Sequence, residues 1–261
     1  MKCGELIRRI EQEIPLEAAE GWDNPGLQVG RREAEVRKVY LALDATDEVV
    51  EHAVAWGADL LITHHPLLIE GIRRINSDDF HGRKILKMAE HHLAHYAMHT
   101  NFDVCRMARA CSSCLGLTDQ QILEVTGENE RGEAQGIGTV GLLPRSMTVR
   151  ECCELVKRSF GLTSVRVFGD LNRMVQRAAL CPGSGKSLLP QVFEKGAEVY
   201  ITGDIGHHDG IDAVDQGLAV IDAGHYGVEH IFMEEMEQYL QERFPELTVE
   251  REKEKNPFAV L

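Results

Sequence analysis

The chain lacks a long hydrophobic run. No segment reaches the ~18 consecutive apolar residues that a membrane-spanning helix requires. The segment MKCGELIRRIEQEIP at residues 1–15 has the spacing of an amphipathic helix, and it lacks the apolar stretch of a signal peptide. From these two absences we expect a cytoplasmic protein.

The cysteines lack the paired spacing of a disulfide framework. There are seven, an odd number, and only Cys111 and Cys114 form a CxxC pair, with no second pair to complete a metal site. The neighbouring Cys152 and Cys153 fall in a predicted helix, where we expect them to serve packing. This cysteine usage is typical of a reducing compartment.

Positive charge is scarce, because 28 lysines and arginines stand against 42 acidic residues and the net charge is −14. Nucleic-acid binding requires clustered basic residues, so we do not expect it. The negative net charge does not exclude binding of a small phosphorylated ligand. A P-loop is also missing, since LCPGSGKS at 180–187 has Leu180 where the motif needs glycine. The alternative function of this segment is that a helix N-terminus beside Lys186 binds a phosphate or another anion.

Strands and helices alternate through the first part of the chain, which at 261 residues is long enough to bury a sizeable core. This alternation predicts a parallel sheet, whose sites lie beyond the carboxyl ends of the strands. We expect strands at 36–43, 58–64 and 96–99, with helices at 46–57, 82–96 and 103–116.

A polar, glycine-bearing stretch at 124–137, EVTGENERGEAQGI, is typical of a boundary, and the alternation resumes after it. The two parts of the chain could therefore be related α/β units. In the second part we expect strands at 138–144, 197–204 and 218–225, with helices at 148–161, 210–217 and 229–244.

Four motifs rich in histidine and acidic residues stand at predicted strand ends: THHP at 63–66, HTNFD at 99–103, GDIGHHD at 203–209 and DAGHYGVE at 222–229. Imidazole and carboxylate ligands suit Zn²⁺, Fe²⁺, Mn²⁺ or Ni²⁺. A buried imidazole doublet also needs partners for its nitrogens, and a metal supplies them. Five histidines outside the motifs are more simply explained as solvated or packed side chains, namely His52, His81, His91, His92 and His95.

Together with GWDNPGLQVG at 21–30, these motifs resemble the NIF-three-like dinuclear metal-centre family, many of whose members are labelled GTP cyclohydrolase 1 type 2 homologues. The resemblance implies the short form of that α/β fold, with two interlocked three-layer α/β/α subdomains and mostly parallel sheets. The first would comprise 1–126 with 246–261, and the second 127–245. It also implies a toroidal homo-hexamer.

Carried over motif by motif, the resemblance implies two divalent transition-metal ions per chain. Their ligands would be His64, His65, Asp103, His225 and Glu229. His99 would stand beside the centre in a catalytic role and His208 at its rim, while Trp22, Asp23 and Asn24 would belong to a structural or pocket-lining loop.

Such a centre implies a metal-dependent hydrolase that uses a metal-bridging hydroxide, with His99 moving a proton. The substrate would be GTP, by opening of the guanine imidazole ring, or another small molecule with a phosphoester or amide bond. The alternative is a non-enzymatic metal-binding scaffold or regulatory partner. An enzyme must keep an open metal position, whereas a scaffold tolerates a closed one.

Overall fold

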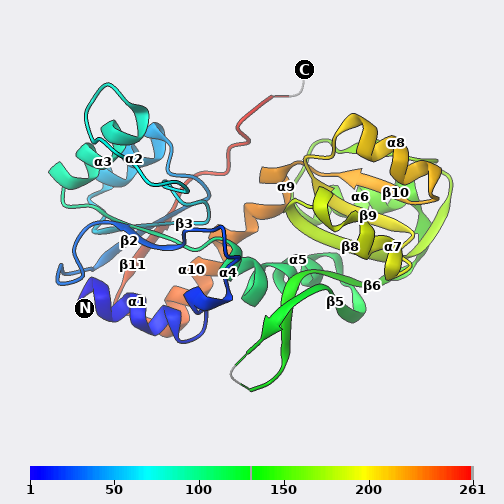
Figure 1. Cartoon of the computed structure of the whole chain (residues 1–261), viewed down its shortest axis with the longest axis horizontal. Coiled ribbons are helices and arrows are strands. Elements are labelled where there is room, and N and C mark those ends of the chain that lie inside the picture. The colour runs from blue at the N-terminus through cyan, green and yellow to red at the C-terminus, as the bar shows by residue number, and fades with distance from the viewer. Residues whose placement is uncertain (130, 260–261) are drawn as a thin grey trace. The chain divides into compact units, whose positions relative to one another are not determined.

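The computed structural model describes residues 1–129 and 131–259, which form two compact units (Figure 1). The first unit comprises 1–102 and 232–254, and the second comprises 103–231 with the described residues from 255 onward. These bounds differ from the predicted ones at 126 and 246, because the helices from Asp103 onward pack against strands of the second sheet. The α/β fold class is confirmed.

The first unit is built on a five-stranded sheet of order β1-β4-β3-β2-β11. Strands β4, β3, β2 and β11 are parallel, and β1 alone runs antiparallel at the edge. All four residues of β3 are buried, as expected for a central parallel strand covered on both faces. The strands are β1 (Gly26–Val29), β2 (Lys38–Ala42), β3 (Leu60–Thr63), β4 (Ala94–Ala97) and β11 (Thr248–Arg251).

Helices cover this sheet on both faces, with α2 and α3 on one side and α1 and α10 on the other (Figure 1). Local signals define α2 closely. The Thr46 hydroxyl accepts the Val49 amide, and Gly57 ends the helix in the left-handed conformation. The helices are α1 (Cys3–Glu11), η1 (Leu16–Ala18), α2 (Asp47–Trp56), α3 (Phe80–Glu90), α4 (Thr100–Phe102) and α10 (Ile231–Arg243).

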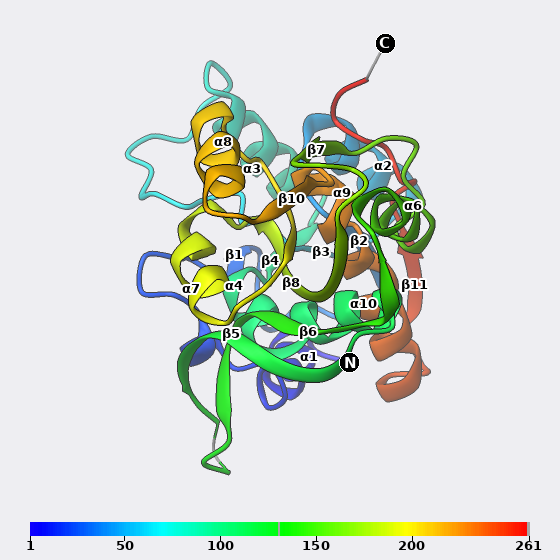
Figure 2. The same ribbon diagram turned by 90° about the vertical axis from the view of Figure 1, so that its right-hand side faces the viewer.

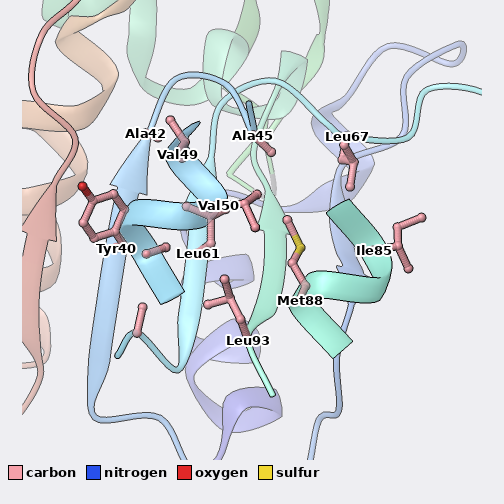
Figure 3. Close-up of a cluster of buried hydrophobic side chains, with 12 residues drawn as sticks. Tyr40, Ala42, Ala45, Val49, Val50, Leu61, Leu67, Ile85, Met88 and Leu93 are labelled. Atoms are coloured by element: carbon pink, nitrogen blue, oxygen red, sulfur yellow. The ribbon is translucent and has the colours of Figure 1, made fainter. Parts of the chain in front are cut away.

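A compact apolar cluster joins α2 and α3 to the sheet (Figure 3). Leu61 on β3 and Met88 on α3 are both fully buried. Each fully buried side chain of this size contributes about 1.5–3 kcal/mol. This packing holds the carboxyl end of β3, and therefore the histidines that follow it, in a fixed place.

The second unit contains a six-stranded sheet of order β5-β6-β8-β9-β10-β7. Its central strands β8, β9 and β10 are parallel, and the outer pairs are antiparallel. The carboxyl ends of β9 and β10 therefore lie at the same edge. The strands are β5 (Thr118–Glu128), β6 (Ala134–Thr148), β7 (Arg166–Phe168), β8 (Met174–Ser184), β9 (Val199–Gly203) and β10 (Ala219–Asp222).

The stretch 124–137 is not a loop at a boundary. Residues 124–128 belong to β5 and residues 134–137 belong to β6, and these two strands pair as a long hairpin that extends away from the rest of the second unit (Figures 1 and 2). Most of β5 is exposed, so its polar composition is compatible with a solvated strand, and pairing with β6 satisfies its backbone. Glu130, at the centre of the predicted boundary, lies outside the described residues.

The helices of the second unit pack around this sheet, and α6 begins with a capping box between Thr148 and Glu151. The segment that starts at Asp103 opens with a π-helical turn, a feature that is frequent at functional sites. The helices are η2 (Asp103–Met107), α5 (Ala108–Leu115), α6 (Val149–Ser159), η3 (Lys186–Leu188), α7 (Leu189–Glu194), α8 (His207–Asp215) and α9 (His225–Glu229).

The predicted helix at 82–96 is too long. Helix α3 ends at Glu90, and strand β4 begins at Ala94. Burial by neighbouring strands overrides the helical pattern, since β4 lies between β1 and β3. Among the described residues, all seven cysteines are free thiols. In the same part of the chain, no helix combines the length and apolar character that crossing a membrane demands.

Candidate metal centre

The histidine doublet stands directly after β3. His64 is fully buried, and its Nδ1 lies 2.8 Å from the carbonyl oxygen of Met98. Because a carbonyl oxygen only accepts hydrogen bonds, Nδ1 of His64 carries the proton. In the neutral ring, Nε2 then has the lone pair, which is the state required of a metal ligand.

His65 is held in the same way by a carboxylate. Its Nδ1 lies 2.8 Å from Oδ1 of Asp44, which follows the neighbouring strand β2. An ionised carboxylate only accepts, so the His65 proton is on Nδ1 and its lone pair is on Nε2. A carboxylate behind a histidine also raises the basicity of the imidazole as a ligand.

His99 follows β4 and donates from Nδ1 to Oδ1 of Asp23 at 2.8 Å. The Asp23 side chain is fully buried, and burial alone would raise its pKa. Hydrogen bonds from His99 and from the amide and hydroxyl of Thr100 outweigh burial and lower the pKa of Asp23 to about 2. Asp23 is therefore a carboxylate at any physiological pH.

These three histidines form one group. A ring nitrogen of each of His64, His65 and His99 lies within 4.8 Å of the other two. All three have Nδ1 bound to an oxygen acceptor, so a divalent ion among the Nε2 atoms would meet lone pairs. His99 therefore lies about as close to His64 and His65 as these two predicted ligands lie to each other.

The second unit carries its own histidine and carboxylate pair. His225 begins α9, donates from Nδ1 to Oδ2 of Asp204 at 2.8 Å, and has Nε2 3.0 Å from Oε2 of Glu229. Glu229 is nearly buried, and the i,i+4 spacing places it on the same helical face as His225. Asp204 has φ of 56°, in the left-handed region that aspartate adopts more readily than most residues other than glycine.

Asp103 belongs to the same part of the second unit as Glu229. Burial raises the pKa of the Cys111 thiol well above its ordinary value, and the charges of Cys114, Glu229 and Asp103 raise it further. Burial also raises the pKa of the Cys181 thiol, and the charges of Asp103 and Glu229 raise it further. Both acids therefore lie near the same buried thiols, as expected if the π-helical turn directs Asp103 toward α9.

Glycine at position 183 makes room for the Glu229 carboxylate. A Cβ atom on Gly183 would stand 2.1 Å from Oε1 of Glu229 and 3.6 Å from Nε2 of His225. Gly183 also has φ of +68°, which disfavours other residues. This glycine is part of the PGSGKS segment, so one function of that segment is to accommodate a predicted ligand.

Gly183→Ala is expected to destabilise the protein and to displace Glu229. The left-handed backbone alone costs alanine about 1–2 kcal/mol, and the contact with the carboxylate adds to this. Gly161→Ala is a matched control, because Gly161 has φ of +63° and open space around its Cβ position. Urea unfolding and metal titration of both variants test this expectation. Equal losses of stability and unchanged metal affinity in both would contradict it.

The sequence prediction did not identify which oxygen acceptors form hydrogen bonds with the histidines. Asp44 and His65 are 21 positions apart, and so are Asp204 and His225. In each pair the acid follows one parallel strand and the histidine follows the next strand. A repeated spacing of this kind between two strand–helix–strand segments was the available signal, and it identifies one Asp–His dyad in each unit, beside the Asp23–His99 pair of the first.

The other predicted candidates have different surroundings. His208 is exposed at the start of α8 and packs edge-on against His207. Lys186, the candidate anion ligand, forms an ion pair with Asp209 at 3.1 Å. His95 was predicted to be a solvated or packed side chain, and it is packed, with no exposed surface.

Comparison with known proteins agrees with this fold. The sequence model described as Duf34/NIF3 (NGG1p interacting factor 3) matches residues 1–257. The chain belongs to this family. A protein of Clostridium perfringens named GTP cyclohydrolase 1 type 2 homolog is 35% identical over 272 residues, with 100% of both chains covered. The predicted family is therefore confirmed.

Solved structures of Duf34/NIF3-like proteins share the whole fold. A crystal structure of a Staphylococcus aureus hypothetical protein matches with a TM-score of 0.92 and 28% identity, covering 100% of this chain and 99% of that one. Reduced HcgD from Methanocaldococcus jannaschii matches with a TM-score of 0.81 and 31% identity, covering 96% and 97%.

The donor sets of both units fit divalent metal ions. The first unit offers the imidazole nitrogens of His64 and His65, with that of His99 beside them, and the second offers the imidazole of His225 beside the carboxylate of Glu229. Nitrogen and carboxylate donors of this kind suit borderline transition metals, and outer acceptors already fix the histidine rings.

Proposed function

We propose that the protein binds two divalent transition-metal ions through His64, His65, Asp103, His225 and Glu229. One observation supports it most directly: Nδ1 of each ligand histidine faces an oxygen acceptor, so Nε2 is the donor atom.

We propose further that the centre serves hydrolysis. Bound divalent ions polarise a substrate oxygen and lower the pKa of water at the site toward neutrality. The relatives named GTP cyclohydrolase 1 type 2 homolog make a nucleotide ring or phosphoester the first substrates to test. The chain contributes the fixed orientation of its histidines and a general base close to them.

His99 is the proposed proton carrier. Its Nδ1 is bound to Asp23, whose pKa of about 2 keeps a negative charge behind the ring. That charge stabilises the imidazolium that forms when Nε2 accepts a proton. His99 is 16% exposed, so a substrate or water can reach it, whereas His64 has no exposed surface.

The family resemblance adds two further proposals. We expect the chain to assemble as a toroidal homo-hexamer and to work in the cytoplasm. Light scattering on the purified protein tests the assembly, because a monomer or dimer at micromolar concentration would exclude a stable hexamer.

His64→Ala and Glu229→Gln are expected to lose most of the bound metal, because each removes a donor from a different unit. Elemental analysis of protein purified without chelator measures this, with His91→Ala as control, since His91 is exposed at the end of α3. The expected content is near two ions per chain in the wild type and the control, and well below this in both folded ligand variants.

Folded wild-type protein that takes up no Zn²⁺, Fe²⁺ or Mn²⁺ would overturn the metal site. Fully loaded protein that hydrolyses none of a panel of nucleotides, phosphoesters and amides would overturn the hydrolase and favour the non-enzymatic scaffold. For an enzyme, His99→Gln is expected to lower kcat by about 100-fold or more while metal content stays close to that of the wild type.

A further inference from the structure

Trp22 is the most exposed large apolar side chain among the described residues, with 61% of its surface accessible. The second tryptophan, Trp56, is half-buried, and its ring contacts the Tyr40 ring and the ammonium group of Lys38. Tryptophan carries a large apolar surface that folding normally covers. The indole of Trp22 therefore presents to solvent an apolar surface that packing does not use.

The loop that carries Trp22 is firmly fixed. The amide of Glu20 donates to the Thr100 hydroxyl, and the Asp23 carboxylate accepts from the Thr100 amide and from His99. On the other side, Nδ2 of Asn24 donates to the carbonyl oxygen of Leu68 at 2.6 Å. Residues on both sides of Trp22 are thus anchored, so the indole is held toward solvent by the fold.

The position of the indole connects it to the histidine group of the first unit. The rings of Trp22 and His99 lie edge-on with centroids 5.7 Å apart. The His99 ring lies 5.2 Å from that of His64 and 5.5 Å from that of His65. A molecule that rests on the exposed indole therefore lies next to the candidate proton carrier.

We infer that Trp22 is a stacking platform for a planar heteroaromatic ring of the substrate. This inference rests on the proposed function and narrows its substrate class. Indole stacks on any flat heterocycle and discriminates little between them, so Trp22 recognises the presence of a ring and not its identity. Substrates with such a ring gain affinity, and the ring places the scissile part of the molecule near His99.

The test uses Trp22 itself as the probe. Trp56→Phe leaves Trp22 as the only tryptophan of the chain. Zn²⁺-loaded protein is titrated with GTP, with ATP and with inorganic tripolyphosphate, which lacks a ring, and is excited at the red edge of the indole band to limit absorption by purines. We expect saturable quenching by GTP and ATP and none by tripolyphosphate.

Binding of the same three ligands is then measured by calorimetry for Trp22→Leu and Trp22→Phe. Loss of one base–aromatic stack weakens binding by about 5- to 150-fold. We expect this loss for GTP and ATP in Trp22→Leu, partial retention in Trp22→Phe, and no change for tripolyphosphate.

Unchanged GTP and ATP affinity in Trp22→Leu would overturn the inference. So would Trp22 emission that responds only to dilution of the protein, because the indole would then cover a contact between copies. Metal content, measured on the same samples, separates the two proposals. Full metal content without ring binding refutes the role of Trp22 alone, whereas absent metal with ring-dependent quenching refutes the metal centre alone.

Discussion

Asp44→Asn and Asp204→Asn are each expected to lower the affinity for divalent metal by about 10- to 100-fold, the range found when the outer partner of a ligand histidine is changed. Asparagine keeps the shape of the side chain and can still accept a hydrogen bond. It removes the negative charge behind the imidazole, and its amide can turn and present a donor to Nδ1. The ligand histidine then loses basicity and a fixed tautomer.

Because the two dyads have the same 2.8 Å contact and the same position after parallel strands, the two losses should be similar in size. The double variant should lose about the product of the two factors if the sites act independently. Competition with a chromophoric chelator measures the affinities without reference to any reaction.

Asp47→Asn and Asp212→Asn are suitable controls, since both acids are exposed on the helices that follow Asp44 and Asp204. They change the net charge by the same amount and leave the histidines in place. Metal affinity that falls equally in the controls would attribute the effect to overall charge. Unchanged affinity in Asp44→Asn or Asp204→Asn would show that the carboxylate does not support its histidine.

A buried histidine outside the metal ligands is expected to dominate the acid sensitivity of folding. His95 lies on β4 with no exposed surface, and its Nε2 is 2.8 Å from the Thr63 hydroxyl. That hydroxyl donates to the carbonyl oxygen of His65, so it accepts from Nε2 of His95. The lone pair is then on the buried Nδ1, which has no hydrogen-bond partner in the part of the chain that the structure describes.

Burial, with a smaller effect of the Lys84 charge, lowers the pKa of His95 from 6.5 to about 3. The unfolded chain therefore binds one proton more than the folded chain between these values. The contribution of a neutral His95 is complete above pH 6.5 and is lost as the pH falls. The slope is about 1.4 kcal/mol per pH unit, so roughly 2 kcal/mol is lost by pH 5.

His95→Gln is expected to remove this part of the pH dependence, because glutamine can still donate to Thr63 and does not titrate. Urea unfolding of metal-free protein at pH 7 and pH 5 measures the difference, with His91→Gln as an exposed control. The stability of His95→Gln should change by about 2 kcal/mol less than that of the wild type. An equal change in both proteins would mean that another group is responsible.

Most of the fold was predictable because its signals are local. The Thr46 cap, the Gly57 stop and the buried run of β3 follow from short stretches of sequence. The hairpin at 124–137 was not predictable in this way. Its arms are polar because they are exposed, and only pairing between β5 and β6 makes them strands.

The same distinction holds for the candidate site. The histidines and acids of the site were predicted from the residue types of the four motifs and from their positions at strand ends, because ligand chemistry is a property of side chains. Asp23 as the partner of His99 was not foreseen, since the two are 76 positions apart and only the folded loop brings them together.

The sequence alone determined the α/β class, the family and the candidate metal ligands. Strand–helix alternation and the chemistry of donor side chains can both be recognised in short segments of the chain. Only the tertiary structure decided which nitrogen of each histidine faces an oxygen acceptor, because that acceptor comes from a distant strand or loop. It also decided that His95 is packed and Trp22 is exposed, since burial depends on contacts between elements far apart in the chain.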